Sequence, residues 1–300
     1  MKKQHTIRWV LYHEPVHLFV RTANAFNEEI QRLTNGRIQV EVYTLDEYAE
    51  KFKNGVYHEP MALIQSDEIE MSQMQAHHLG IWGNTDFFAL EMPYLFKDHD
   101  HATRVLDGDI GRSLLTSLAE KTPVTGLAFT YSGGYRVMAT DKEITDIDDF
   151  KGLSLISNPN PVTIDTAKTI GCNPTPYYTM DVDSKKSALE LGNCMIETTL
   201  PRYEFEAIPS VQKNIVDTGH SLYLTSILIS SRLWAELDDE DKEFVRQAAR
   251  KAGVRERHES VAEADEYAAN FKRHEELGIS YKKLTDEQSA KLKEIVQPLY

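Results

Sequence analysis

The chain has 300 residues, of which 41% are hydrophobic and 27% charged, and its formal net charge is −14. No stretch reaches the ~18 uninterrupted apolar residues that a membrane-spanning helix needs, so we expect a soluble globular protein with one large core or two smaller ones. The negative charge argues against a nucleic-acid-binding protein, because phosphate recognition requires a basic face. It does not argue against a small anionic ligand, which responds to the local field.

The first half of the chain alternates predicted strands and helices. Residues 6–13 are β-rich, and from Val16 apolar residues recur at helical spacing up to Asn35-Gly36, a pair typical of a helix end. The next segment, 37–43, alternates polar and apolar residues as a half-buried strand does. After it we expect a helix near 59–67, a short strand at 69–74 and helices within 99–120.

The second half continues this alternation around a double glycine. Residues 123–140 are predicted to form two strands on either side of Gly133 and Gly134. Further strands are predicted at 153–156, 175–178, 194–198, 223–230 and 279–282. The predicted helices lie at 161–170, 183–191 and 239–276, and a last one begins at Thr285, which forms a capping-box pattern with Gln288. Alternation of this kind indicates an α/β fold.

The helical stretch 239–276 is too long for an ordinary helix. A helix of ~35 residues spans roughly 50 Å, which is the length of two domains. The chain contains no flexible linker, so we expect strands to make the division near residues 130–135 and to cross it more than once. We expect domain I to hold residues 1–133 and about 222–255, and domain II to hold residues 134–221 and about 256–300.

Two cysteines, Cys172 and Cys194, are too few for a disulfide framework or a CxxC site. Each is expected to be a small core residue, and a single bridge between them is left open. The chain begins "MKKQHTIRWV", with two lysines but no apolar segment or cleavage site of a signal peptide. An exported protein would therefore be present here in its mature form, and a cytoplasmic protein is the alternative.

Histidines cluster at two places, His77 with His78 and His99 with His101. Their spacing matches neither a helical HxxxH motif nor a facial triad, so we favour solvated loop and helix-start residues over metal ligands. Motifs for nucleotide binding and for hydrolysis are absent from the sequence. We therefore expect no metal, no cofactor and no catalytic residue.

Arg136 follows the double glycine and lies between apolar strand residues in "GGYRVMAT". A strand-borne arginine that points into a cleft can bind a carboxylate through two parallel hydrogen bonds. An arginine paired with an acidic residue of the protein itself is the structural alternative. The pattern leaves both interpretations open.

The order of several segments resembles the substrate-binding proteins of tripartite ATP-independent periplasmic (TRAP) transporters, the C4-dicarboxylate-binding family. The similarity runs from about residue 6 to residue 250, and the segments that carry it are "RLTNGRIQVEVY", "ALEMPYLFKD", "SGGYRVMAT", "DIDDFKGLSL", "GCNPTPY" and "LWAELDDEDKEFVRQAA". The resemblance implies two α/β domains that close on a ligand like a clam shell, with one long helix spanning both. It also implies a monomeric periplasmic protein that binds organic anions, has no enzymatic activity and works with integral-membrane TRAP subunits.

The chain departs from the family at one prominent position. Family members carry a signature arginine at the end of the strand that corresponds to residues 153–156, and this chain has Ile156 there. Either another cation, with Arg202 as the first candidate, takes its place, or the ligand differs. We expect a small organic acid with an apolar or aromatic part. The expected ligand-binding residues are Arg136, Tyr12, His13, Gln75, Ile156, Asn158, Tyr178, Thr198 and Thr199.

Two alternatives use other features of the same sequence. A sensory receptor that presents its ligand to a membrane kinase would keep the fold and have no transport role. A metal-dependent enzyme would use His77, His78, His99 and His101, and metal analysis of the purified protein distinguishes it from a binding protein.

Overall fold

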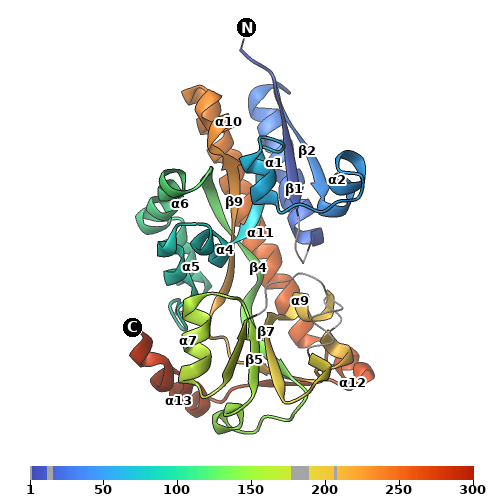
Figure 1. Ribbon diagram of the computed structural model, residues 1–300, viewed down its shortest axis with the longest axis vertical. Helices are drawn as coiled ribbons and strands as arrows, with labels where there is room; N and C mark the ends of the chain where they lie inside the picture. Colours follow the sequence, from blue (N-terminus) through green and yellow to red (C-terminus); the bar gives the residue numbers. More distant parts are fainter. Residues whose placement is uncertain (1, 12–15, 177–188, 206–207) are drawn as a thin grey trace. The chain divides into compact units, whose positions relative to one another are not determined.

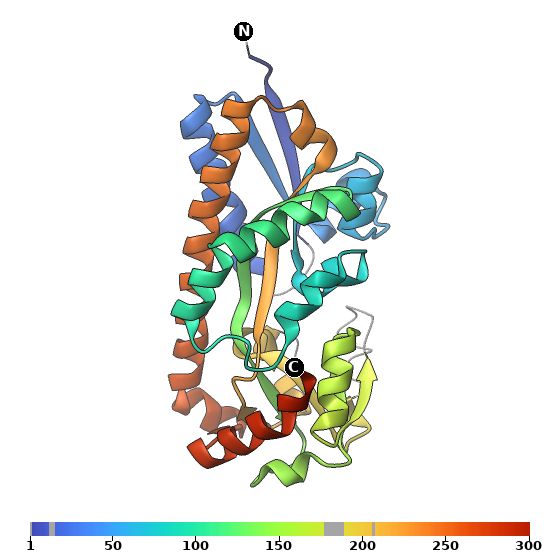
Figure 2. The same cartoon turned by 90° about the vertical axis from the view of Figure 1, so that its left-hand side faces the viewer.

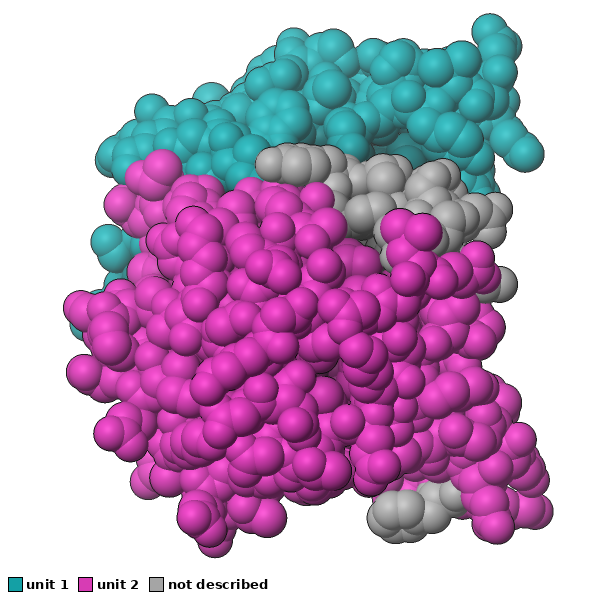
Figure 3. Space-filling model, turned by 60° about the horizontal axis from the view of Figure 1, so that its bottom comes forward, with its two compact units in different colours: residues 1–84, 99–131, 224–260 teal, residues 85–98, 132–223, 261–300 magenta. Residues whose placement is uncertain are grey.

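The computed structural model describes residues 2–11, 16–176, 189–205 and 208–300 (Figure 1). None of the helices within these ranges is long and apolar enough to cross a membrane. The chain forms two compact units, which Figure 3 distinguishes by colour. Unit 1 contains residues 1–84, 99–131 and 224–260, and unit 2 contains residues 85–98, 132–223 and 261–300.

Unit 1 is built on a mixed sheet with the strand order β2-β1-β3-β9-β4. Strand β1 pairs in parallel with β2 and β3, and β3 pairs antiparallel with β9. The strands are β1 (His5–Leu11), β2 (Ile38–Thr44), β3 (Met71–Gln75), β4 (Val124–Thr140) and β9 (Leu222–Ser230). The helices are α1 (Val16–Thr34), α2 (Leu45–Phe52), α3 (Pro60–Gln65), α4 (Ala76–Ile81), α5 (His99–Leu106), α6 (Asp109–Lys121), α10 (Ser231–Glu236) and α11 (Asp239–Ala269).

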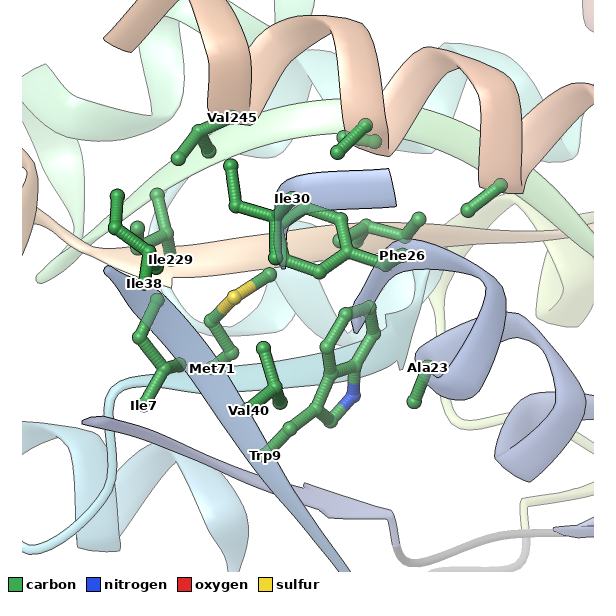
Figure 4. Packing of buried hydrophobic residues seen from close by; sticks show 14 of the residues in the cluster. Ile7, Trp9, Ala23, Phe26, Ile30, Ile38, Val40, Met71, Ile229 and Val245 are labelled. Atoms are coloured by element: carbon green, nitrogen blue, oxygen red, sulfur yellow. The ribbon is translucent and has the colours of Figure 1, made fainter. Parts of the chain in front are cut away.

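The core of unit 1 forms where α1 packs on the sheet. Phe19, Ala23, Phe26 and Ile30 recur every three or four residues, so they share one face of α1, and all four are buried. On the sheet side, the Trp9 ring meets the Phe26 ring edge to face with centroids 5.4 Å apart (Figure 4). Figure 2 shows α1 in blue beside the first turns of α11 in orange, and buried alanines of α11 join the same core. The predicted helix from Val16 is confirmed.

Unit 2 contains a sheet with the strand order β4-β7-β5-β6, to which β8 adds at β4 and β10 adds at β8. Strand β5 runs parallel to β6 and β7, whereas β7 runs antiparallel to β4. The strands are β5 (Ser154–Ser157), β6 (Asn173–Pro176), β7 (Cys194–Thr199), β8 (Asn214–Asp217) and β10 (Ser280–Lys283). The helices are η1 (Thr85–Glu91), η2 (Ile147–Phe150), α7 (Pro161–Thr169), α9 (Leu200–Phe205), η3 (Ile208–Ser210), α12 (Phe271–Leu277), α13 (Asp286–Val296) and η4 (Gln297–Leu299).

Both faces of the unit 2 sheet are apolar and covered. Leu155 and Met195 belong to the cluster on one face, while their neighbours Ile156 and Ile196 belong to the cluster on the other face. This arrangement follows from the alternation of side chains along a strand and explains why 153–156 reads as a continuous apolar run. The capping box predicted at Thr285 is present, because its side chain accepts from the Gln288 amide and the Gln288 side chain accepts from the Thr285 amide.

Three segments differ from the sequence-based prediction. Residues 124–140 form one continuous strand rather than two, and both glycines have positive φ values within it instead of ending the strand. The helix predicted at 239–276 ends at Ala269, and Asn270 caps a separate helix, α12. The predicted helix 183–191 and the end of the predicted strand 175–178 fall partly outside the described residues.

The division into units differs from the expected domain boundaries in one segment. Residues 85–98 belong to unit 2 rather than to the same unit as residues 1–84. Two contacts explain this assignment: the Tyr94 amide donates to the His220 carbonyl, and Glu91 pairs with Arg136. The strands β4 and β9 and the helix α11 each have residues in both units. The expected crossing by strands and by one long helix is therefore present, and the domain boundaries themselves stay a prediction.

The two cysteines are not bridged. Both are free and buried, and they belong to the clusters on opposite faces of the unit 2 sheet. The Cys172 thiol donates to the Phe150 carbonyl at 3.2 Å, and burial raises the pKa of Cys172 to about 12. Each cysteine is thus a core residue, as expected.

Gly133→Ala should be far more destabilising than Gly134→Ala. Both glycines have positive φ, +90° and +80°, so alanine is strained at either position. A Cβ at 133 would also lie 2.2 Å from Thr199 Oγ1, whereas a Cβ at 134 meets nothing closer than 4.0 Å. We expect Gly133→Ala to lose roughly 1–3 kcal/mol more than Gly134→Ala in urea denaturation. Equal losses would mean that β4 and β7 can separate at this point without cost.

Candidate functional site

The candidate site lies at the carboxyl edge of the unit 2 sheet. Strands β5, β6 and β7 are parallel, so their carboxyl ends meet at one edge, and the register pairs Arg136 of β4 with Thr199 at the end of β7. Ligands of open α/β sheets bind outside the carboxyl ends of the strands. Four of the residues expected from the sequence lie at or near this edge, namely Arg136, Ile156, Thr198 and Thr199.

Arg136 is held by groups of the protein itself. Its side chain is 1% exposed, and Nη2 lies 2.7 Å from Glu91 Oε2. Nη1 donates to Ser221 Oγ at 2.8 Å, and Nε lies 3.8 Å from Glu197 Oε2. The guanidinium also stacks over the Tyr223 ring, 4.4 Å from its centroid. The arrangement favours the structural alternative raised for Arg136, an arginine paired with internal acids.

Glu197, which lies within ion-pair distance of Arg136, begins a hydrogen-bonded chain. Glu197 Oε1 lies 2.8 Å from His220 Nε2, and His220 Nδ1 lies 2.7 Å from Thr218 Oγ1. Burial raises the pKa of Glu197, but the charge of Arg136 and the His220 hydrogen bond outweigh it, so the pKa lies below its usual value. For Glu91 burial prevails over the attraction of Arg136, and its pKa is raised. The Arg136 guanidinium thus outweighs the effect of burial on the pKa of Glu197 but not on the pKa of Glu91.

A second arginine contacts the same aromatic ring. The Arg202 guanidinium lies 4.9 Å from the centroid of Tyr223, and Arg202 is buried in α9, directly after the end of β7. Cation–π contacts of this kind favour Tyr223 as a shared platform for both guanidinium groups. The residue named from the sequence as a replacement for the missing signature arginine therefore contacts the same ring as Arg136.

Ile156 is part of the apolar core rather than of a polar wall. It is 3% exposed and belongs to the cluster of Val137, Ile196 and Tyr203. An alkyl group fits this position, because an arginine there would place its charged head among apolar side chains. The surroundings of Ile156 thus suit an alkyl side chain rather than the signature arginine of the family.

Several hydroxyl groups lie at the ends of β5 and β7. Thr199 Oγ1 donates to the Ser132 carbonyl at 2.8 Å and so fastens β7 to β4. The buried hydroxyls of Ser157 and Thr198 have no hydrogen-bond partner among the residues that the structure describes. Buried polar groups are rarely left unsatisfied, and a bound solute or a water molecule can supply the partner.

The loop after β5 leads into helix α7. Asn158 is half-buried there, and its carbonyl accepts from the Asn160 amide at 2.9 Å. Asn160 is fully buried and caps α7 by accepting from the Thr163 amide. The Asn160 side chain therefore caps α7, and of the two asparagines in this loop only Asn158 is partly accessible.

The remaining expected residues lie elsewhere or outside the described residues. Gln75 is buried at the end of β3 in unit 1, where it precedes helix α4. Tyr12, His13 and Tyr178 lie outside the described residues. The residues that sequence reasoning missed are Ser157, Glu91, Glu197, His220, Ser221 and Tyr223. An arginine on a buried strand needs an acidic partner, but that rule does not select one from the 47 acidic residues of the chain.

The histidine clusters do not form a metal site in the described part of the chain. The rings of His77 and His78 contact each other with centroids 4.4 Å apart in α4. The His99 ring instead faces Tyr131, at 5.6 Å. No group of three or more His, Cys, Asp or Glu side chains within the described ranges is placed to hold a metal ion.

Comparison with known proteins gives consistent matches over nearly the whole chain. Residues 12–300 match the family described as bacterial extracellular solute-binding protein, family 7. The sialic acid-binding periplasmic protein of Vibrio cholerae is 26% identical, over 78% of this chain and 70% of its own length. The C4-dicarboxylate-binding periplasmic protein of Rhodobacter capsulatus is 27% identical, over 80% of this chain and 76% of its own.

Solved structures confirm the predicted fold class. A TRAP periplasmic solute-binding protein from a Polaromonas species, bound to D-erythronate, has 27% sequence identity and a TM-score of 0.82. The similarity covers 99% of this chain and 93% of that chain. A similar protein from Haemophilus influenzae, bound to L-gulonate, reaches a TM-score of 0.83 at 21% identity and shares the fold.

Proposed function

The chain belongs to the bacterial extracellular solute-binding proteins of family 7, and we propose that it captures a small organic acid for a TRAP-type uptake system. Membership of this family confirms the resemblance drawn from the sequence motifs. The relatives are named for binding sialic acid and C4-dicarboxylates, and one structural relative holds D-erythronate. All of these solutes carry a carboxylate. The proposal extends to a periplasmic location and to integral-membrane partner subunits.

The observation that carries this proposal is the pair of buried guanidinium groups on Tyr223. Arg136 is compensated by Glu91 and Glu197, and Arg202 brings a second guanidinium group to the same Tyr223 ring. A positive charge at the carboxyl edge of the sheet attracts an anion even in a chain of net negative charge. The carboxylate of the solute is proposed to face this pair.

The rest of the solute is proposed to face groups without charge. Ile156 and Ile196 are buried in the apolar core behind the ends of β5 and β7, and the Ser157 and Thr198 hydroxyls at these ends lack partners among the described residues. Hydroxyl or amide groups of a solute would satisfy these hydroxyls, whereas a second carboxylate would be desolvated without a counter-charge. The contacts predicted for Tyr12, His13, Gln75, Asn158 and Tyr178 stay predictions.

Capture requires neither a cofactor nor a reaction in this proposal. The solute binds one conformation better than the other, and this differential affinity supplies the free energy for closure of the two units. Scattering from solutions with and without the solute reports such closure as a smaller radius of gyration.

A thermal-shift panel tests the proposed solute class. Monocarboxylates with hydroxyl or apolar groups, such as erythronate and gulonate, should raise the melting temperature by several degrees, because a ligand at 100 times its Kd stabilises by about 2.7 kcal/mol. Succinate, malate and fumarate should act weakly or not at all. If only neutral polyols raise the melting temperature, the organic-acid proposal is wrong. If the C4-dicarboxylates bind at micromolar affinity, the function stands and the account of Ile156 fails.

Arg202→Gln provides the matching genetic test. The variant should lose the rise in melting temperature caused by the carboxylate that stabilises the wild type most. A charge-assisted contact is worth roughly 1.5–3 kcal/mol. Arg246→Gln is the control, because Arg246 also stacks on an aromatic ring, that of Trp234, at 4.9 Å, but lies in unit 1. If Arg202→Gln retains the full rise in melting temperature, Arg202 does not bind the solute.

A further inference from the structure

A second buried polar cluster lies in unit 1. Gln73, Thr130, Thr225 and Glu256 have no exposed surface. Gln73 Nε2 lies 2.9 Å from each carboxyl oxygen of Glu256, and 3.0 and 3.2 Å from the Thr130 and Thr225 hydroxyls. The two threonine hydroxyls are 2.5 Å apart. Four different elements, β3, β4, β9 and α11, thus meet in one hydrogen-bonded network.

Three of the four residues of this network lie close to the points where the chain passes from unit 1 to unit 2. Unit 1 residues of β4 end at Tyr131, those of β9 begin at Leu224, and those of α11 end at Ser260. Thr130 and Thr225 are each one residue from these limits, and Glu256 is about one helical turn from its own. Within unit 1, the network therefore ties together the three segments that continue into unit 2.

Within the described part of the chain, we find no charged group placed to compensate a Glu256 carboxylate. The described residues of β3, and those of β4 and β9 that belong to unit 1, carry no ionised side chain. Helix α1 contributes the Thr22 hydroxyl, which contacts Glu256 and also donates to the Leu18 carbonyl at 3.0 Å, while Arg21 pairs with Glu259 instead.

The charged neighbours of Glu256 on its own helix are also directed elsewhere. Arg257 donates to Asp107 and to the Phe129 carbonyl. Arg255 pairs with Glu259, and His258 is exposed to solvent. An ionised Glu256 would therefore be a buried charge without a counter-ion, which costs several kcal/mol.

The hydrogen-bond network around Gln73 and Glu256 also requires one more proton. Gln73 Nε2 contacts four oxygen atoms with two hydrogens, and Thr130 and Thr225 have one hydroxyl hydrogen each. The close contact between the two hydroxyls uses one of these hydrogens. The contacts outnumber the hydrogens, and the amide nitrogen cannot accept a proton. With the Gln73 amide turned over, Oε1, which has no partner among the described residues, faces Glu256 and accepts a hydrogen bond from a protonated carboxyl.

We propose that Glu256 is protonated in the folded protein at neutral pH, and that this proton completes the network which holds β4, β9 and α11 together in unit 1. Burial, which is opposed by hydrogen bonds from Thr22, Gln73, the Tyr131 amide and Thr130, raises the pKa of Glu256 from 4.5 to about 8. Between these pH values the folded chain holds a proton that the unfolded chain has lost. Stability therefore falls as pH rises through this window.

Urea denaturation between pH 5 and pH 9 tests the proposal with Glu256→Gln, an uncharged mimic of the protonated acid. Relative to this variant, the unfolding equilibrium constant of the wild type should rise about tenfold per pH unit between about pH 5 and pH 8. Glu259→Gln is the control on the same helix, since Glu259 is paired with Arg21 and Arg255. It should keep the pH dependence of the wild type.

Infrared spectroscopy gives a second measurement, which does not depend on unfolding the protein. The difference between the spectra of the wild type and Glu256→Gln at pH 7 should contain a protonated carboxyl band, and this band should disappear around pH 8. The proposal is overturned if no such band exists at pH 7. It is equally overturned if the wild type and Glu256→Gln show parallel stability curves across this pH range.

Discussion

Arg136→Ala is expected to lower the free energy of unfolding by about 3–5 kcal/mol, because it leaves Glu91 and Glu197 buried without their shared counter-charge. Ser221 Oγ loses its donor in the same variant. Equilibrium denaturation in urea at pH 7 measures the loss. A large effect is expected even without any solute, since every one of these partners belongs to the protein.

A double variant separates lost pairing from lost packing. In Arg136→Met with Glu91→Gln, the most closely paired charges are removed together, so much of the stability should return. Arg112→Ala is the control, because Arg112 and its partner Asp109 are 61% and 99% exposed, and such a pair contributes little. If Arg136→Ala is as stable as the wild type but no longer binds solute, Arg136 is the ligand clamp first considered from the sequence.

Ile156→Arg is expected to cost about 3 kcal/mol or more, since it places a guanidinium in an apolar cluster where Ile156 is 3% exposed. The same substitution restores the arginine that is typical of the family at this position. Urea denaturation, followed by titration with succinate, distinguishes the two consequences. We expect a destabilised protein with weakened binding of its own solute.

Two comparisons give this experiment its controls. Ile156→Met keeps the volume and should cost less than about 1.5 kcal/mol. Val254→Arg introduces the same charge at a position in α11 that is 37% exposed, and its effect should stay within about 0.5 kcal/mol. A stable Ile156→Arg protein that binds succinate would show that the new guanidinium reaches the solute, and that the site differs from the family only in this residue.

Local patterns in the sequence were sufficient for most of the regular elements. The apolar spacing of Phe19, Ala23, Phe26 and Ile30 predicts α1, and Thr285 with Gln288 predicts the start of α13. Such signals depend on residues three or four positions apart, so they are visible without any knowledge of the fold. The α/β class and the solute-binding family also follow from the order of these local segments.

Patterns that depend on distant neighbours were predicted less well. The double glycine in β4 suggested a turn, but Gly133 lies against Thr199 of β7, and this close approach requires a residue without a side chain. Asn270 interrupts the long helical segment by capping α12 through its own side chain. In both places the outcome depends on a contact or a cap that competes with the local preference.

The sequence by itself determined that this protein is a two-part α/β chain of a known solute-binding family, with a basic strand residue at 136 and an alkyl residue at 156. Only the tertiary structure decided what those residues do. Strand register brings Glu197 beside Arg136, while η1 supplies Glu91 and β9 supplies Tyr223. These partners lie 45 to 87 positions from Arg136 along the chain. No local pattern links residues so far apart, because their contact exists only once the strands have paired and buried the charges together.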